Sequence, residues 1–259
     1  MADFLDVLAR DANETINSGY YEAVKETATF HISLKKAILE TKNAPVITEI
    51  KAASPSAGTI RKNVEAGNLA KSMEKGEAVG ISVLTEPKHF KGSLHTLAEA
   101  RKAVIIPILM KDIILSPVQL NAASKAGANV ALLIKALFDR GYCECDLHEM
   151  IARAHSKGLE VLLETHTAEE FCSAVRCNAD LVGINNRNLA TLKVDLSVTK
   201  RILERNSAEG KIVVSESGIN TLGDLRFLRE CGAHAFLIGS AVMLADNVEN
   251  KVKELVSAL

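Results

Sequence analysis

Short apolar segments recur along the chain and are separated by segments in which apolar residues follow a helical period. Each apolar segment is four to seven residues long and rich in β-branched side chains, which is typical of buried strands. The intervening segments, such as 93–103, 118–128 and 196–206, have the spacing of amphipathic helices. Eight strands are predicted, over residues 45–50, 80–84, 104–110, 130–134, 159–163, 181–184, 211–214 and 235–238.

This alternation predicts the fold class. Continuous apolar strands that alternate with helices form a parallel sheet covered on its outer face. Residues 45–259 hold the eight units at about 27 residues each, which favours an α/β fold, a single (β/α)8 TIM barrel. Residues 1–44 lie outside the repeat and are predicted to form an N-terminal helical extension. We therefore expect one domain over residues 1–259.

Several helix boundaries carry signals of their own. Ser116 is a capping residue followed by Pro117, which is favoured at the first helical position. Thr167 and Glu170 have the spacing of a capping box. Glycines that follow helical segments and are expected to adopt a left-handed conformation are Gly127, Gly158 and Gly232.

Composition and charge exclude several classes of protein. The 31 Lys and Arg balance 32 Asp and Glu, so the basic excess of a nucleic-acid binder is missing. The longest apolar runs, 103–110 and 130–134, are far shorter than the roughly 20 residues of a membrane span. The N-terminal residues lack the basic and apolar regions of a signal peptide, and five scattered cysteines suit a reducing compartment. We expect a cytoplasmic enzyme with a small-molecule substrate and no nucleic-acid or membrane partner.

Metal and cofactor patterns are also missing from the sequence. Cys143 and Cys145 form a C-x-C pair without a second cluster, so free thiols are expected. The seven histidines form no H-E-x-x-H pair, and no G-x-G-x-x-G follows a predicted strand. We therefore expect no metal and no cofactor.

Charged residues end several predicted strands, where the active site of a parallel barrel lies. Glu49 and Lys51 lie on the same side of the first strand because side chains alternate. Lys111 ends the third strand and Glu164 the fifth, with His166 close enough to reach the rim. One such pair can be a structural plug, but two lysines and at least two glutamates exceed that need. They predict acid–base chemistry.

Small residues follow the last two strands, as Ser217-Gly218 and Gly239-Ser240. Glycine allows a ligand to approach the backbone closely, and amides at a helix N-terminus bind anions. Either pair alone could be a simple turn. Together, after adjacent strands of a barrel, they predict a phosphate-binding cup.

At these positions the sequence closely resembles the indole-3-glycerol phosphate synthases, a family of tryptophan-biosynthesis enzymes. The resemblance runs in family order from about Pro45 to the end of the chain, and residues 1–44 resemble the helical extension of the family. The matching segments are EIKAASPSAG (49–58), ISVLTEPKHFKGS (81–93), PILMKD (107–112), LLETH (162–166), LVGINNRNL (181–189), VVSESGI (213–219) and FLIGSAVM (236–243).

The resemblance implies a carboxy-lyase that closes 1-(2-carboxyphenylamino)-1-deoxyribulose 5-phosphate to indole-3-glycerol phosphate, losing carbon dioxide and water without a redox cofactor. Lys111 would be the general acid on the ketone, with a pKa lowered by the nearby Lys51. Lys51 would hold the substrate carboxylate and could serve as an acid in dehydration; which lysine performs which protonation is left open. Glu164 would stabilise positive charge on the anilino nitrogen or accept a proton. Glu49 would orient Lys51, and Asn185 would help position the substrate.

The resemblance also implies binding roles for the remaining mouth residues. Arg187 would position the substrate or its charged groups, while Glu216 and Ser217 would contact the ribulosyl hydroxyls. The phosphate would be bound by Ser54, Gly218, Gly239 and Ser240. The anthranilate ring would lie against the apolar side chains of Leu84, Phe90 and Leu132.

Two positions depart from the family pattern. Ile113 stands where the family commonly has Phe, which weakens stacking on the anthranilate ring and bears on affinity rather than reaction type. Ala52 stands where many relatives carry a basic residue.

Three other functions fit a phosphosugar-binding barrel. A lysine in the mouth could form a Schiff base, as in class I aldolases. A barrel resembling phosphoribosylanthranilate isomerase would need a Cys and Asp pair, but no cysteine ends a predicted strand. A non-enzymatic binding barrel would retain the cup and lose the acid–base set. Monomer, homodimer and a docked pathway enzyme are all compatible with the sequence.

Overall fold

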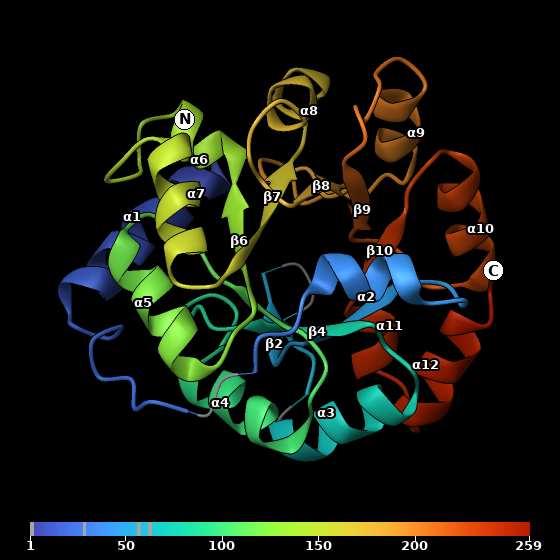
Figure 1. Cartoon of the computed structure of the whole chain (residues 1–259), viewed down its shortest axis with the longest axis horizontal. Coiled ribbons are helices and arrows are strands. Elements are labelled where there is room, and N and C mark those ends of the chain that lie inside the picture. The colour runs from blue at the N-terminus through green and yellow to red at the C-terminus, as the bar shows by residue number, and fades with distance from the viewer. Residues whose placement is uncertain (1–2, 28–29, 56–57, 62–63) are drawn as a thin grey trace.

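Eight parallel strands close into a barrel in the computed structural model, which describes residues 3–27, 30–55, 58–61 and 64–259 (Figure 1). Ser56 and Ala57 of the matching segment 49–58 lie outside the described residues. The predicted TIM barrel is confirmed. Around the ring, in sequence order, the strands are β1 (Val46–Ile50), β4 (Gly80–Leu84), β5 (Ile108–Lys111), β6 (Val130–Ile134), β7 (Glu160–Thr165), β8 (Leu181–Asn185), β9 (Ile212–Glu216) and β10 (Ala235–Ile238). A hairpin of β2 (Ala53–Ser54) and β3 (Gly58–Thr59) follows β1.

Helices surround the barrel; most connect consecutive strands, and the last two follow β10 (Figure 1). They are α3 (Ala66–Lys75), α4 (Leu94–Ala103), α5 (Pro117–Ala126), α6 (Lys135–Asp139), α7 (Leu147–Ser156), α8 (Ala168–Ala174), α9 (Ser197–Leu203), α10 (Leu222–Glu230), α11 (Ser240–Met243) and α12 (Val248–Val256). None of the helices in the described part of the chain has the length and apolar character needed to cross a membrane.

The predicted helix boundaries are largely confirmed. Ser116 caps α5 in a full capping box with Gln119. The Thr167 hydroxyl accepts from the Glu170 N–H, but the Glu170 carboxylate binds the N–H of His166, so only half of that predicted box forms. The three predicted left-handed glycines are confirmed, with φ of 92°, 72° and 102° at Gly127, Gly158 and Gly232.

The third strand begins later than the apolar pattern 104–110 predicts, because β5 starts at residue 108. Ile105 is 66 % exposed, and its N–H donates to Glu74 Oε1 at 2.9 Å instead of joining a ladder. Pro107 has no N–H to donate. Residues 104–107 are as apolar as the strand that follows them, so composition alone did not show that they form a connection.

Four strands end one or two residues later than predicted: β5, β7, β8 and β9. The extension places four polar site residues within the ladders, where backbone hydrogen bonds fix their direction. These residues are Lys111, Glu164, Asn185 and Glu216.

The N-terminal segment forms the two helices α1 (Phe4–Asn17) and α2 (Leu34–Glu40), in accord with the predicted extension. They close opposite ends of the barrel. At the amino ends of the strands, Glu160 of β7 accepts from the N–H groups of Leu34 and Lys35 at 2.9 and 3.1 Å. At the carboxyl ends, Phe4 and Leu8 of α1 line the mouth.

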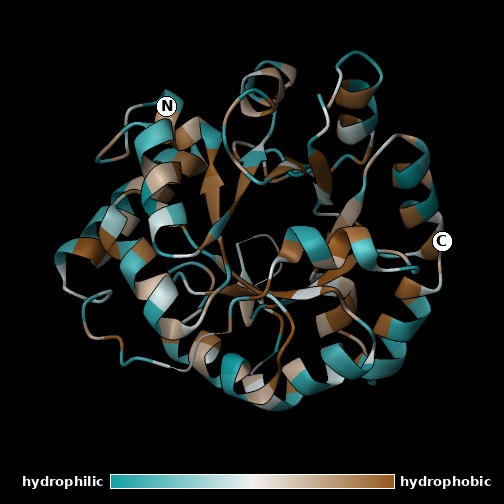
Figure 2. Ribbon diagram, in the orientation of Figure 1, coloured by the Kyte–Doolittle hydropathy of each residue, from teal (hydrophilic) through white to brown (hydrophobic). Residues whose placement is uncertain are grey.

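The core has two layers because strand side chains alternate. Met110 and Leu133 pack outward against the helices, whereas Leu109 and Leu132 point into the barrel. Leu8 of α1 belongs to the inner cluster, so the extension is part of the core. Figure 2 shows hydrophobic strands at the centre and hydrophilic colour on the outer faces of the helices.

Candidate active site

A cavity of about 330 Å³ opens at the carboxyl ends of the strands. Every site residue predicted from the sequence lines it. From the strands and the loops that follow them these are Glu49, Lys51, Ser54, Leu84, Phe90, Lys111, Leu132, Glu164, Asn185, Arg187, Glu216, Ser217, Gly218, Gly239 and Ser240. The structure therefore brings these positions together at one end of the barrel, while the roles of these residues remain predictions.

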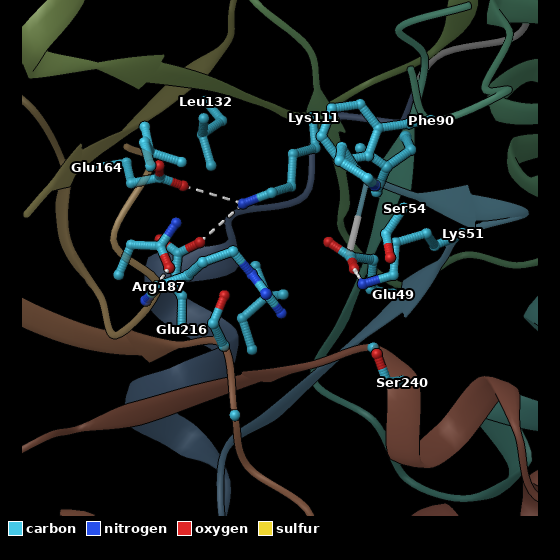
Figure 3. Close-up of a pocket in the computed structure, with 18 of the residues that line it drawn as sticks. Glu49, Lys51, Ser54, Phe90, Lys111, Leu132, Glu164, Arg187, Glu216 and Ser240 are labelled. Atoms are coloured by element: carbon cyan, nitrogen blue, oxygen red, sulfur yellow. Dashed lines mark hydrogen bonds and ion pairs between the residues drawn. The ribbon is translucent and has the colours of Figure 1, made fainter. Parts of the chain in front are cut away.

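Lys111 is at the centre of the buried charges. Its Nζ lies 2.8 Å from Glu216 Oε2 and 3.0 Å from Glu164 Oε2 (Figure 3). Burial alone lowers the pKa of Lys111, but Glu164, Glu216 and Glu49 outweigh it and raise that pKa above its ordinary value. The expectation that Lys51 lowers the pKa of Lys111 is therefore wrong, because the carboxylates lie closer to the ammonium and outnumber that cation.

The two carboxylates beside Lys111 have opposite pKa shifts. Burial opposes ionisation of Glu164, but Lys111, His166 and an Asn185 hydrogen bond lower its pKa well below its usual range. Burial and the nearby Glu164 charge raise the pKa of Glu216 to about 7 despite its bond to Lys111. Glu216 Oε1 is buried without a hydrogen-bond partner among the described residues. Glu164 is thus ionised at neutral pH, whereas Glu216 gains or loses its proton near neutrality.

Gly183 of β8 makes room for this arrangement. A Cβ at Gly183 would collide with Glu216 Oε1. The absence of a side chain at Gly183 leaves the space that the Glu216 carboxylate occupies when it contacts Lys111. No sequence signal singled out this position.

Lys51 and Glu49 form a second ion pair, with Nζ and Oε1 2.8 Å apart. Both side chains point into the mouth, as strand alternation predicted (Figure 3). Gly239 lies against this pair, since a Cβ there would overlap the Glu49 carboxylate and lie 3.0 Å from Lys51 Nζ. The glycine after β10 therefore makes room for the pair.

Two of the predicted phosphate residues, Ser54 and Ser240, lie on the Lys51 side of the cavity (Figure 3). After β9 the chain turns sharply through Ser217 and Gly218, with left-handed φ of 68° and 85°. The helix that follows is capped internally, because the Asn220 and Thr221 N–H groups donate to Asp224 at 2.9 and 2.8 Å. Anion donors after β9 are therefore expected in the turn rather than at the start of α10.

The apolar wall includes residues that the sequence did not reveal. Phe4 and Leu8 of α1 line the cavity together with the predicted Leu84, Phe90 and Leu132. Their spacing of four residues marks one face of a helix, but no local pattern shows where that face docks. Ile113, which replaces the common Phe, lines the same cavity.

The loop that carries Phe90 is fixed from two sides. Glu86 accepts the N–H groups of Lys88, His89 and Phe90 at 2.7–3.0 Å. The His89 ring lies 2.8 Å from Asp11 of α1. The wall of the cavity is thus held by the N-terminal extension.

Asp112, next to Lys111, ties the same extension to the strand ends. Its carboxylate accepts from Thr85 Oγ1 at 2.5 Å and from the Tyr21 hydroxyl at 3.0 Å. Burial raises the pKa of Asp112 to about 6. Asp112 directly follows Lys111 in the sequence, but nothing in the sequence indicates its partner Tyr21, 91 residues away.

Some predictions concern residues that do not line the cavity. His166 does not line the cavity but lies behind Glu164, at 3.3 Å. Cys143 and Cys145 are free thiols. Across residues 3–27, 30–55, 58–61 and 64–259, no cluster of three His, Cys, Asp or Glu side chains is arranged to hold a metal ion. No cysteine is among the described residues that line the cavity.

The chain is similar in sequence to the members of one enzyme family. The family model for indole-3-glycerol phosphate synthase matches residues 6–255. An indole-3-glycerol phosphate synthase from Bacillus mycoides is 37% identical over 252 residues, covering 96% of each chain. One from Methanocaldococcus jannaschii is 43% identical over 229 residues, covering 87% of this chain and 83% of the relative.

Solved structures with low sequence identity share the fold. N-acetylmannosamine-6-phosphate 2-epimerase from Clostridium perfringens has a TM-score of 0.60 at 15% identity, covering 83% of this chain and 93% of the other. Thiamine phosphate pyrophosphorylase from Pyrococcus furiosus has a TM-score of 0.60 at 16% identity, covering 87% and 97%. At these identities the likeness concerns the barrel alone.

Proposed function

Because this chain belongs to the indole-3-glycerol phosphate synthase family, we propose that its mouth residues carry out the ring closure of that family. The reaction converts 1-(2-carboxyphenylamino)-1-deoxyribulose 5-phosphate to indole-3-glycerol phosphate, with loss of carbon dioxide and water. The enzyme is a carboxy-lyase of tryptophan biosynthesis. Residues 1–259 act as one domain, because α1 completes the cavity wall.

Lys111 is the general acid that acts on the substrate ketone. An ammonium group has three donors, and Glu164 and Glu216 accept from two of them, so within the described residues one donor remains for a substrate oxygen. The raised pKa keeps Lys111 protonated until substrate arrives. The ketone oxygen gains negative charge as the ring carbon attacks it, and the fixed ammonium stabilises that charge.

Glu164 stabilises the positive charge that develops on the anilino nitrogen, or accepts a proton from the ring. Its lowered pKa keeps it ionised at neutral pH. The amide of Asn185 supports the same carboxylate. Glu216, with a pKa near 7, can both hold and release a proton beside Lys111 and contact the ribulosyl hydroxyls.

Lys51 holds the substrate carboxylate until it leaves as carbon dioxide, and can protonate the leaving hydroxyl in dehydration. Glu49 orients it at 2.8 Å. Arg187, half-buried at the same mouth, adds a further positive charge for the substrate. Its guanidinium is fixed by the Leu192 carbonyl at 2.9 Å.

The substrate spans the cavity from a polar end to an apolar wall. Its phosphate lies against Ser54, Gly218, Gly239 and Ser240, and Ser217 contacts the ribulosyl chain. The anthranilate ring lies between Leu84, Phe90 and Leu132, supported by Phe4 and Leu8.

The observation that carries this proposal is the partly buried Lys111 ammonium, which lies between two buried carboxylates whose pKa values are shifted in opposite directions. A Schiff-base aldolase would require a neutral lysine, and the carboxylates hold Lys111 charged. Product formation can be followed by indole fluorescence, against a low background because the chain has no tryptophan. Product from the carboxyphenylamino substrate without added metal would support the proposal. No product from the folded enzyme, or a borohydride-trapped adduct with a phosphosugar, would refute it.

A further inference from the structure

His166 and Lys111 contact different oxygens of one buried carboxylate. Lys111 Nζ is 3.0 Å from Oε2 of Glu164, and His166 Nε2 is 3.3 Å from Oε1. Glu164 lines the active-site cavity, whereas His166 lines a second hollow behind it. The carboxylate thus has Lys111 on the cavity side and the His166 imidazole on the opposite side.

Glu170 holds the far side of the imidazole. Its Oε2 lies 3.6 Å from His166 Nδ1 and accepts the backbone N–H of His166 at 2.7 Å. Glu170 is in the first turn of α8, so a helix fixes its position. His166 is therefore placed between two carboxylates, and each ring nitrogen faces one of them.

We propose that His166 is a positioning residue, carried as an imidazolium between Glu164 and Glu170, that keeps Glu164 ionised and in place when Lys111 turns to the substrate. Glu170 in turn positions His166. This inference rests on the proposed function, because it assigns the second counter-ion of the carboxylate that the ring closure uses.

The need for a second counter-ion follows from the chemistry of Lys111. When Lys111 gives its proton to the ketone oxygen, it becomes neutral and no longer compensates the buried Glu164 charge. A buried carboxylate without a cation takes up a proton, and Glu164 would then lose its charge at the step that requires it. His166 does not face the substrate and keeps its own proton through this step.

The proton affinity of His166 agrees with this role. Burial alone lowers the pKa of its imidazole, but Glu164 and Glu170 outweigh burial and raise it to about 9.

Other charges around His166 come from several elements. Arg187 and Lys193 line the same hollow, and Lys135 of α6 faces Glu170. Two further pairs line the hollow, Asp3 with Arg140 and Asp195 with Arg201.

The surrounding cations oppose protonation of His166, and the charges within each Asp–Arg pair largely cancel. The two carboxylates on the ring nitrogens are therefore the source of the raised pKa, and removing either should lower it. A raised pKa shows only that His166 is charged, so its role in catalysis needs a second measurement, the pH dependence of turnover.

The first experiment is an NMR titration of the histidine imidazoles in the resting enzyme, with the His166 signal assigned by its loss in His166→Gln. We expect a midpoint near pH 9 in the wild type, and a midpoint at least about one unit lower in Glu170→Gln. A wild-type midpoint near the ordinary value of about 6.5 would overturn the proposal. Because this titration needs no turnover, it tests the charge state of His166 independently of the proposed function.

The second experiment is the pH profile of kcat for indole-3-glycerol phosphate formation. His166→Gln keeps an N–H donor but removes the charge, so Glu164 should be protonated more easily and the acidic limb should rise by about one pH unit. KM should change less than kcat, because His166 does not touch the substrate. The matched control is His155→Gln, which removes a 2.9 Å pair with Asp180 away from the mouth and should leave the profile unchanged.

The outcomes distinguish a failure of the proposed function from a failure of the positioning role of His166. Wild-type enzyme that forms no product would refute the proposed function, whereas an active wild type with superimposable profiles in His166→Gln would refute the positioning role. If His166→Gln does not fold, Glu170→Gln is measured in its place. It should shift the acidic limb in the same direction, and an unshifted limb would overturn the proposal.

Discussion

The ammonium of Lys111 lies 2.8 Å from the carboxylate of Glu216, slightly closer than the 3.0 Å that separates it from Glu164. Glu216 is therefore a direct partner of the proposed acid, not only a contact for substrate hydroxyls. Its pKa of about 7 makes it the member of the cluster that changes charge near neutrality.

Glu216→Gln should remove an ionisation near pH 7 from the profile of kcat/KM, which reports groups of the free enzyme. The substitution imitates the protonated form, so the fold should be retained. We expect kcat to fall about 100-fold, because the group can no longer release a proton. A variant that keeps both the ionisation and full turnover would contradict the role of Glu216.

The protonation of Glu216 also has a consequence for stability. Its pKa is raised from an ordinary 4.5 to about 7 in the folded state, so the folded protein binds its proton more tightly than the unfolded chain. The stability from this group is fully present below about pH 4.5 and is lost as the pH rises towards 7. Glu216→Gln should therefore destabilise the protein less at pH 7.5 than at pH 5, as measured by urea unfolding.

Gly239→Ala should displace the Lys51 and Glu49 pair, because the added methyl would overlap the Glu49 carboxylate. Steady-state kinetics should show a higher KM and a lower kcat, each by about 10-fold, given that misplacement by about 1 Å is costly. Gly67→Ala in α3 is the matched control, since its Cβ would make ordinary contacts with Ala103 and Glu99 of α4 at 3.5 and 3.6 Å. Equal kinetics for the two variants would contradict the close packing at Gly239.

Phe4→Ala tests whether α1 forms part of the substrate site. Loss of the ring should raise KM about 10-fold with little effect on kcat, because an apolar wall binds ground state and transition state alike. Phe30→Ala, beside Arg101 and away from the cavity, is the control and should leave KM unchanged. An unchanged KM in Phe4→Ala would exclude α1 from the binding site.

Glu160→Ala tests whether the amino end of the barrel, opposite the mouth, contributes to stability but not to activity. Glu160 accepts from the N–H groups of Leu34 and Lys35 and from the Ser33 hydroxyl, so it caps α2. Its loss should lower the free energy of unfolding by about 1–2 kcal/mol in urea denaturation. Turnover at 25 °C should be unchanged, and a fall in kcat would contradict the assignment of α2 to structure alone.

The barrel could be predicted because each unit carries its own local signal. The β-branched runs and the capping of α5 by Ser116 need no information from elsewhere in the chain. The same logic located the mouth, since residues at strand ends such as Lys111 and Glu164 must converge once the barrel closes. Residues at the ends of separate strands thereby became one predicted site.

The remaining features depend on contacts between distant segments, which local patterns do not encode. The docking of Phe4 at the mouth and the bond from Tyr21 to Asp112 join the extension to the barrel. The pKa of Lys111 was predicted in the wrong direction because its sign depends on which charges lie nearest. The sequence indicated that Lys51 lies in the same mouth as Lys111. Only the structure shows that the Glu216 carboxylate is 2.8 Å from the Lys111 ammonium.

The most direct test of the central claim is the turnover number of Lys111→Met, measured by indole fluorescence beside an exposed control, Lys102→Met. Circular dichroism would establish that both variants are folded. If Lys111 is the general acid, its replacement should lower kcat by at least about 100-fold, and the control should match the wild type. Wild-type turnover in folded Lys111→Met would contradict the mechanism proposed here.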